Sequence, residues 1–378
     1  MQQGPRQEVF KSLIPKPLPP APPIEFSAEF LDLMEKANLA LGRLDGLARL
    51  LPDLQLFLYF YLRKESVLSS QIEGTQSSLS ELLLFESNQL TGAPNNDVVE
   101  VSNYVSALQY GLKRLRQDLP ISIRLMKEIH GVLLARGKGK DKRPGEFRDS
   151  QNWIGGSRPG NAAFVPAPKE EVVTLMGQIE TFYHENRSLP ALVKAALIHV
   201  QFETVHPFLD GNGRLGRMLI TLMLVADGVL SEPLLYLSLY FKQHRSSYYD
   251  LLQRVRFEGD WEEWLSFFFT AVLETAQQAV STAHEVLRLF KRDRNRVEGL
   301  GRIRGTAILV HELFQKKPYL TISSASKELH LSQPAVTNAM RALQKLKMVK
   351  ETSGRNWNRI YVYSNYLLIM TEGAEAPG

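Results

Sequence analysis

The chain has 378 residues, of which 44% are hydrophobic and 22% charged, and this composition is typical of a globular protein with room for two or three domains. It contains no cysteine, which excludes a disulfide framework and cysteine-ligated zinc sites. The formal net charge of +5 is uneven: from Lys291 onward fifteen Lys and Arg stand against seven Asp and Glu, a balance of +8 that leaves −3 for the first 290 residues.

The first residues lack the basic and then apolar pattern of a signal peptide, and no apolar run approaches the length that spans a bilayer. We therefore expect a cytoplasmic location and no membrane partner. Residues 1–26 are rich in proline and predict an extended N-terminal arm. The pattern leaves open whether this arm lies along the rest of the protein or stays mobile.

Residues 27–118 predict an N-terminal helical region. Ser27 is a suitable cap for its first helix. A second helix, from about residue 54, ends in the segment 69–74, where Gly74 is a natural helix stop. Ser69 and Glu73 are four residues apart and therefore share one helix face.

Residues 119–258 predict a helical core interrupted by an irregular stretch. Short extended pieces at 153–154 and 163–166 flank a Gly-rich turn and indicate a β-hairpin. His130 and His199 each lie on a helix, and we interpret both as structural. Tyr240, Tyr248 and Tyr249 suit either the adenine side of a nucleotide pocket, with Tyr248 closest, or ordinary aromatic packing, and this choice stays open.

The stretch 206–217, HPFLDGNGRLGR, joins two apolar helical runs and concentrates reactive groups. His206 is a base that titrates near neutrality, and Asp210 is an oxygen ligand of the kind that Mg²⁺ accepts. Gly211 and Gly213 allow backbone N–H groups to approach an anion at the start of the following helix. Arg214 and Arg217 are three residues apart and offer planar guanidinium groups to phosphate oxygens. The pattern predicts an enzyme site for a nucleoside triphosphate and an acceptor group.

This stretch resembles the signature of the Fic family, H-P-F-x-D-G-N-G-R-x-x-R, at every fixed position. The resemblance extends over roughly residues 27–269 and implies an enzyme that transfers AMP from ATP to a Ser, Thr or Tyr hydroxyl of a target protein. It implies His206 as the catalytic base, Asp210 as the Mg²⁺ ligand and Phe208 as an anchor of the loop. The ATP-binding residues that we predict on this basis are Gly211, Asn212, Gly213, Arg214, Leu215, Gly216, Arg217 and Tyr248.

The segment 69–74 is similar to the inhibitory motif of the same family, [S/T]-x-x-x-E-[G/N], formed here by Ser69, Glu73 and Gly74. The resemblance implies that Glu73 pairs with Arg217 and competes with the ATP γ-phosphate for it. The alternative is a solvated glutamate at a helix end. The hairpin at 153–166 likewise resembles the family's flap, which holds a target segment by strand addition, and its alternative is an inert surface hairpin.

Residues 259–296 predict a long linking helix, and residues 297–366 predict a basic winged helix-turn-helix domain followed by a tail, 367–378. Ser332 would cap its second helix, whose exposed face carries Gln333, Thr337, Asn338 and Arg341. Such a domain binds DNA or docks on protein, and the sequence does not decide between them.

The predicted fold is therefore mainly α, a helical Fic core with a β-hairpin flap and a small C-terminal winged-helix domain. The predicted function is that of an autoinhibited protein adenylyltransferase. Two alternatives remain: a Fic enzyme that uses another donor or removes AMP, and a DNA-binding regulator whose core senses nucleotide. The sequence leaves open whether the protein forms a homodimer and which protein it modifies.

Overall fold

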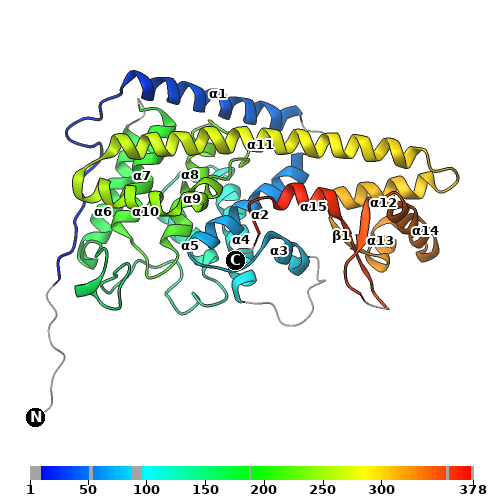
Figure 1. The fold of residues 1–378 in the computed structure, drawn as a ribbon. Coiled ribbons are helices and arrows are strands. Elements are labelled where there is room, and N and C mark those ends of the chain that lie inside the picture. Colours follow the sequence, from blue (N-terminus) through cyan, green and yellow to red (C-terminus); the bar gives the residue numbers. More distant parts are fainter. Residues whose placement is uncertain (1–9, 51–53, 87–95, 187–188, 355–356, 376–378) are drawn as a thin grey trace, which may run out of the picture.

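A computed structural model describes the chain except for residues 1–9, 51–53, 87–95, 187–188, 355–356 and 376–378. The described part is mainly helical, with one small sheet near the C-terminal end (Figure 1). This agrees with the fold class that the sequence predicts.

The N-terminal region contributes five helices: α1 (Ala28–Leu50), α2 (Leu54–Ile72), α3 (Leu79–Glu86), α4 (Asn96–Leu115) and α5 (Ile123–Leu133). The predicted cap at Ser27 is present, because the backbone N–H of Phe30 donates to its hydroxyl at 3.2 Å. Helix α2 runs into the interior, and every residue from Leu56 to Ile72 except the partly buried Tyr59 is buried. Its last turn is therefore held in place by packing on all sides.

The central helices are α6 (Val172–Glu185), α7 (Ala191–Val205), α8 (Asn212–Ala226), α9 (Ser238–Gln243) and α10 (Arg245–Glu258). Helix α7 is buried from Leu192 through Val205, as expected of a helix that is apolar on nearly all sides. It packs against α8, and the loop between these two helices carries the signature.

Helix α11 (Trp261–Glu298) has 38 residues and therefore a length of about 57 Å. Figure 1 shows it along the top of the molecule, with α1 beside it, reaching from the central helices to the C-terminal unit. Its N-terminal part is anchored by Trp264, which is fully buried and donates its indole N–H to the carbonyl of Ala196 on α7 at 3.1 Å.

The C-terminal unit contains α12 (Arg304–Lys316), β1 (Tyr319–Thr321), α13 (Ile322–Leu329), α14 (Gln333–Lys345), β2 (Val349–Glu351) and β3 (Ile360–Tyr363). The strands form an antiparallel sheet in the order β1–β3–β2, with Leu320 opposite Tyr361 and Lys350 opposite Val362. The Ser332 hydroxyl accepts from the N–H of Ala335 at 3.4 Å, as predicted for the cap of α14. The helix-turn-helix that we predicted corresponds to α13 and α14, whereas strand β1 was not predicted.

The predicted boundary of a tail at residue 367 is wrong, because Ser364–Thr371 form a helix, α15, that returns to the core. Tyr366 is 1% exposed and packs edge-on against Phe60 of α2 and Phe290 of α11, with ring centroids 5.0 and 4.9 Å away. The Gln71 side chain of α2 donates to the carbonyl of Glu375 at 2.8 Å. Apolar packing that the local pattern does not reveal thus fixes this segment.

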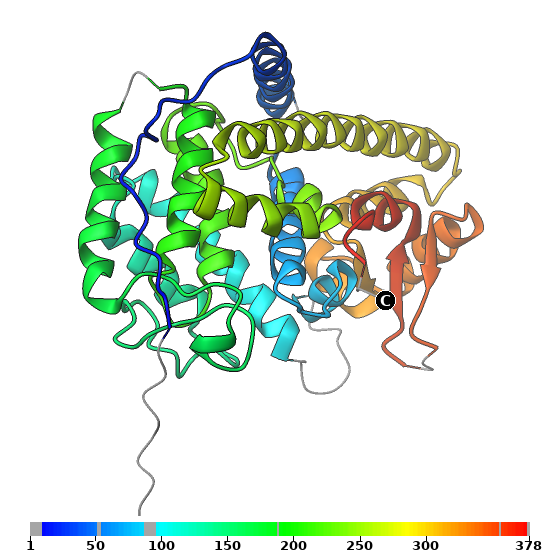
Figure 2. The ribbon, with the colours of Figure 1, turned by 60° about the vertical axis from the view of Figure 1, so that its left-hand side comes forward.

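The described part of the N-terminal arm lies along the core beside α6 and α7 (Figure 2). Three hydrogen bonds hold it: Leu13 N–H to Val165 O at 3.0 Å, the Gln201 amide to Lys16 O at 2.8 Å, and Glu25 N–H to the Glu262 carboxylate at 3.0 Å. Among the described helices, none is long and apolar enough to cross a membrane.

The packing of α15 gives a direct test. We expect Tyr366→Ala to lower the free energy of unfolding by about 3 kcal/mol, because it empties a fully buried aromatic site. Leu368→Ala is the matched control on the same helix: Leu368 is 71% exposed, so its truncation should change stability by less than about 0.5 kcal/mol. Urea unfolding measures both, and equal effects would contradict the docking of α15.

Candidate active site

The loop between α7 and α8 changes direction through two left-handed residues. His206 ends α7 with φ of 49° while its N–H donates to Phe202 O at 2.9 Å, and Gly211 precedes α8 with φ of 77°. Glycine adopts this conformation without steric cost, whereas a histidine there is uncommon and must be held by its surroundings. The result places the His206 side chain near the N-terminus of α8.

The inside of this loop is held by Phe208, Asn212 and His130. Phe208 is fully buried and stacks on His130 of α5 with ring centroids 3.8 Å apart. The Asn212 amide accepts from Phe208 N–H and donates to Phe208 O, both at 2.8 Å. The Asn212 side chain thus closes the loop, and its predicted role in ATP binding stays a prediction.

His130 supports the loop from the opposite side. Its Nδ1 accepts from Gly145 N–H at 2.9 Å, so its Nε2 carries the proton and donates to Asp210 O at 2.9 Å. Burial lowers the pKa of His130 to about 4, while the hydrogen bond to Asp210 and its negative charge raise this pKa by less. A neutral imidazole of fixed tautomer therefore joins α5 to the loop, in agreement with the structural role predicted for it.

His206 lines a cleft of about 350 Å³. Burial lowers the pKa of His206 to about 4, and the positive charges of Arg256 and Arg148 act in the same direction. Its Nδ1 has no hydrogen-bond partner among the residues that the structure describes. Arg148 fixes its backbone by donating from Nε to His206 O at 3.0 Å. The imidazole is therefore neutral at physiological pH and able to accept a proton.

Arg217 is the most enclosed cation of the site, with a side chain that is 1% exposed. Its Nε donates to the Ser69 hydroxyl at 2.9 Å, and its Nη2 donates to the Ser69 carbonyl at 2.9 Å and to Glu73 Oε1 at 2.8 Å. Burial alone would lower the pKa of Arg217, but Glu73 raises it above the ordinary value. The predicted contact between Glu73 and Arg217 is present, and Ser69 shares in it.

Gly213 makes this contact sterically feasible. Its missing Cβ would stand 2.1 Å from Glu73 Oε1 and 3.0 Å from Arg217 Nη1, closer than a side chain allows. Gly74 follows Glu73 with φ of 96°, which turns the chain away at the end of α2. The glycines at 74 and 213 thus allow the carboxylate to lie directly over the first turn of α8.

Arg214 lies between two carboxylates. Its Nη2 is 3.3 Å from Asp210 Oδ1, and its Nη1 is 3.4 Å from Glu100 Oε2 of α4. The Arg214 side chain is 6% exposed, whereas that of Asp210 is 41% exposed toward the cleft. Burial raises the pKa of Glu100, against the opposing charge of Arg214. The cleft thus gathers a base, Arg214 and several carboxylates around the start of α8, and Arg217 contacts it through Glu73.

Comparison with known proteins identifies this arrangement. Family models described as "Fic/DOC family N-terminal" and "Fic/DOC family" match residues 31–113 and 120–224. The chain is a Fic-domain protein. It is 31% identical over 200 residues to the protein adenylyltransferase Fic of Drosophila willistoni and 30% identical over 203 residues to that of Aedes aegypti, covering 52% of this chain in each case. The chain spans 37% of the length of these curated relatives.

Solved Fic structures share the fold. A Fic family protein from Desulfovibrio desulfuricans G20 matches with a TM-score of 0.59 at 20% identity, over 90% of this chain and 98% of its own. A Fic domain containing signaling protein from Bacteroides thetaiotaomicron VPI-5482 matches with a TM-score of 0.53 at 18% identity, over 67% of this chain and 97% of its own. At this identity the likeness concerns the fold alone.

Four of the predicted ATP-binding residues, Leu215, Gly216, Arg217 and Tyr248, are outside the described lining of the cleft, and of these only Arg217 contacts a lining residue through its side chain, Glu73. Tyr248 is 1% exposed and its hydroxyl lies 2.9 Å from His199 Nε2, so it belongs to the aromatic core, as the alternative interpretation had it. Leu215 is fully buried, and a Cβ on Gly216 would lie 2.5 Å from Glu203 of α7. Helical geometry directs residues 215 and 216 away from the face that carries 213, 214 and 217.

The cleft also contains residues that the sequence gave no reason to select. Glu100 and Asp97 come from α4, and Lys138 comes from the basic loop after α5, where its Nζ lies 3.1 Å from Asp97 Oδ1. Charged residues on an amphipathic helix look alike in sequence, so only the packing of α4 beside the signature singles out Glu100.

The predicted flap of the Fic domain is a minimal hairpin. Ile154 and Phe164 exchange two backbone hydrogen bonds of 2.8 and 3.1 Å, and the turn contains a short 3₁₀ helix, Pro159–Asn161. Helix α10 holds its second strand: Gln253 donates to Ala163 O at 3.2 Å, and the Arg256 guanidinium lies 4.1 Å from the Phe164 ring centroid.

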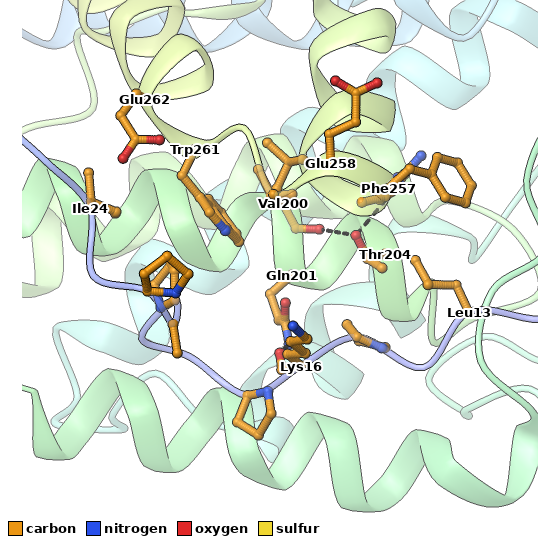
Figure 3. Close-up of a pocket in the computed structure, with 18 of the residues that line it drawn as sticks. Leu13, Lys16, Ile24, Val200, Gln201, Thr204, Phe257, Glu258, Trp261 and Glu262 are labelled. Atoms are coloured by element: carbon orange, nitrogen blue, oxygen red, sulfur yellow. Dashed lines mark hydrogen bonds between the residues drawn. The ribbon is translucent and has the colours of Figure 1, made fainter.

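A second cavity, of about 410 Å³, lies between the N-terminal arm and the start of α11 (Figure 3). Gln201 and Thr204 of α7 line it beside Trp261, and the Thr204 hydroxyl donates to Val200 O at 2.7 Å. His206 and Arg214 are absent from its described lining and present in that of the other cleft, so we place the reactive centre there.

The state of His206 can be measured directly. We expect its imidazole to titrate with a midpoint near pH 4, because burial and two nearby arginines disfavour the protonated form. NMR of the imidazole nitrogens, assigned with His206→Gln, gives the midpoint. A midpoint at the ordinary histidine value near 6.5 would contradict the enclosure of this side chain.

Proposed function

We propose that this Fic domain transfers AMP from ATP to a Ser, Thr or Tyr hydroxyl of a target protein. The observation that carries the proposal is the convergence, at the N-terminus of α8, of a half-buried neutral histidine and two arginines, of which Arg214 lines the cleft and Arg217 contacts Glu73 in its lining. The similar proteins of Drosophila willistoni and Aedes aegypti are named protein adenylyltransferases, which supports the same activity.

In the proposed reaction His206 removes the proton from the target hydroxyl. The hydroxyl oxygen forms a bond to the α-phosphorus of ATP while the bond from that phosphorus to the pyrophosphate oxygen breaks, and pyrophosphate leaves. Backbone N–H groups from Gly211 to Gly213 and the positive end of α8 would stabilise the negative charge on the phosphates. Positioning and charge stabilisation supply most of the catalysis in phosphoryl-type transfers.

The residues present fit a Mg²⁺ ion carried by the nucleotide. Asp210 exposes its carboxylate to the cleft, and Mg²⁺ is commonly bound through one or two carboxylates together with substrate phosphates. Among the described residues no group of three or more His, Cys, Asp or Glu could hold a metal without such help. Asp210 would hold the ion, which when bound neutralises charge on the phosphates.

We further propose that Glu73 inhibits the enzyme. Its carboxylate accepts from Arg217 at 2.8 Å, and an anionic phosphate would need the same guanidinium. A Glu73 side chain in this place also lies over Gly213, at the start of α8. Carboxylate and triphosphate would therefore compete for one position.

Auto-labelling with ATP radiolabelled at the α-phosphate tests both parts. We expect Glu73→Gly to raise the incorporation of AMP at least about tenfold over the natural chain. A tenfold change corresponds to about 1.4 kcal/mol, which is well within the strength of a buried hydrogen bond to a charged group. Glu73→Gly combined with His206→Ala should lose the label.

Each failure has its own meaning. Equal labelling of the natural chain and Glu73→Gly would contradict the proposed inhibition by Glu73. Equal labelling with and without His206 would contradict its proposed role as the base. If none of the proteins incorporates AMP, a panel of other donors, such as UTP and CDP-choline, and an assay for removal of AMP from a modified target would separate the remaining Fic activities.

The C-terminal unit supports a second proposal, binding of DNA. Its α14 exposes Gln333, Asn338 and Arg341, the kinds of side chain that read base edges, in a region of net charge +8. Docking on another protein is a second possible use of the same surface, and formation of a homodimer is a third possible use.

We expect the full chain to bind duplex DNA with an affinity that falls steeply as salt rises, because phosphate contacts release counterions. Arg341→Gln should weaken binding, whereas Arg124→Gln, an exposed arginine on α5, should not. Fluorescence anisotropy at low and high salt measures this. Absence of binding at low salt would rule the proposal out.

A further inference from the structure

Glu100 reaches the cleft from α4, outside both the signature and the segment 69–74. Its Oε2 lies 3.4 Å from Arg214 Nη1, while Asp210 Oδ1 lies 3.3 Å from Arg214 Nη2. The side chains of Glu100 and Arg214 are 14% and 6% exposed. Each terminal nitrogen of this guanidinium is thus already directed at a carboxylate, and its Nε is buried without a partner in the described part of the chain.

The charge of the cleft is unfavourable for a polyanion. Its described lining contains four carboxylates, those of Glu73, Asp97, Glu100 and Asp210, against the two cations Lys138 and Arg214. Glu73 is engaged with Arg217, and Asp97 lies 3.1 Å from Lys138. Asp210 faces the cleft and suits the nucleotide's metal ion. Glu100 is left as a carboxylate with no part in the proposed chemistry.

We infer that Glu100 competes with the triphosphate for Arg214, as a second acidic competitor beside Glu73. The inference rests on the proposed nucleotide site. A metal ion at Asp210 would weaken the attraction of that carboxylate for Arg214, but Glu100 would keep its own. Each arginine of the signature then has a carboxylate rival from the N-terminal helical region, Glu73 for Arg217 and Glu100 for Arg214. Helix α4 would set the affinity for ATP together with α2.

Glu100→Gln in the Glu73→Gly background isolates this effect, because glutamine has nearly the same shape and no charge. We expect the KM for ATP to fall about tenfold while kcat changes less than about twofold, and the difference to shrink at high salt as the repulsion is screened. Glu100→Asp keeps the charge and should keep most of the high KM.

Glu128→Gln is the matched control, since Glu128 lies on α5, pairs with Arg114 and Arg124, and is not part of the cleft lining. It removes one negative charge from the protein and should leave the KM unchanged. An unchanged KM in Glu100→Gln would overturn the inference. So would a raised KM, which would mean that Glu100 holds Arg214 ready for phosphate.

Failure of the proposed function has a separate signature. If Glu73→Gly incorporates no AMP, the Kd of a fluorescent ATP analogue, measured for the same variants without turnover, still tests Glu100. A Kd that falls in Glu100→Gln supports competition at a site that only binds nucleotide, and a Kd that stays constant or rises overturns it.

Discussion

The burial of the Arg217 guanidinium constrains the rest of this structure. A cation that is 1% exposed must find hydrogen-bond acceptors, and the three found in the described part of the chain come from the end of α2 and the residue after it. The contact therefore joins the N-terminal helical region to the signature helix α8. The same contact engages Nε and Nη2 of Arg217, so the proposed inhibition and the packing of α2 would have one physical origin.

The loop that carries His206 is held by a different set of interactions, which do not involve α2. Phe208, Asn212 and neutral His130 hold its backbone through packing and hydrogen bonds on its inner side. A site needs its reacting groups fixed before substrate arrives, and this set provides that whether or not Glu73 is in place. We therefore expect substitution of Glu73 or Glu100, the carboxylates that face the arginines, to leave the conformation of the loop intact.

The C-terminal unit is in direct contact with the helix that carries the segment 69–74. Tyr366 packs on Phe60, and Gln71 bonds to Glu375 O only two residues before Glu73. Gln71 also donates to Ser77 O, which ties together the turn between α2 and α3. The two parts of the protein are therefore joined by packing as well as by the long helix α11.

Sequence alone determined the chemistry of the site, because residues 206–217 are contiguous and the pattern fixes which groups a single loop and helix start can bring together. It also predicted the helical class, and the resemblance to the Fic family predicted the contact of Glu73 with Arg217. Tertiary structure decided what depends on distant packing: the return of α15 to α2, the enclosure of Tyr248 beside His199, and the approach of Glu100 to Arg214. Periodicity tells which face of a helix is buried, but it does not tell which neighbour covers that face. The contact between Glu100 and Arg214, which lie 114 positions apart and belong to no shared motif, therefore becomes visible only in the folded chain.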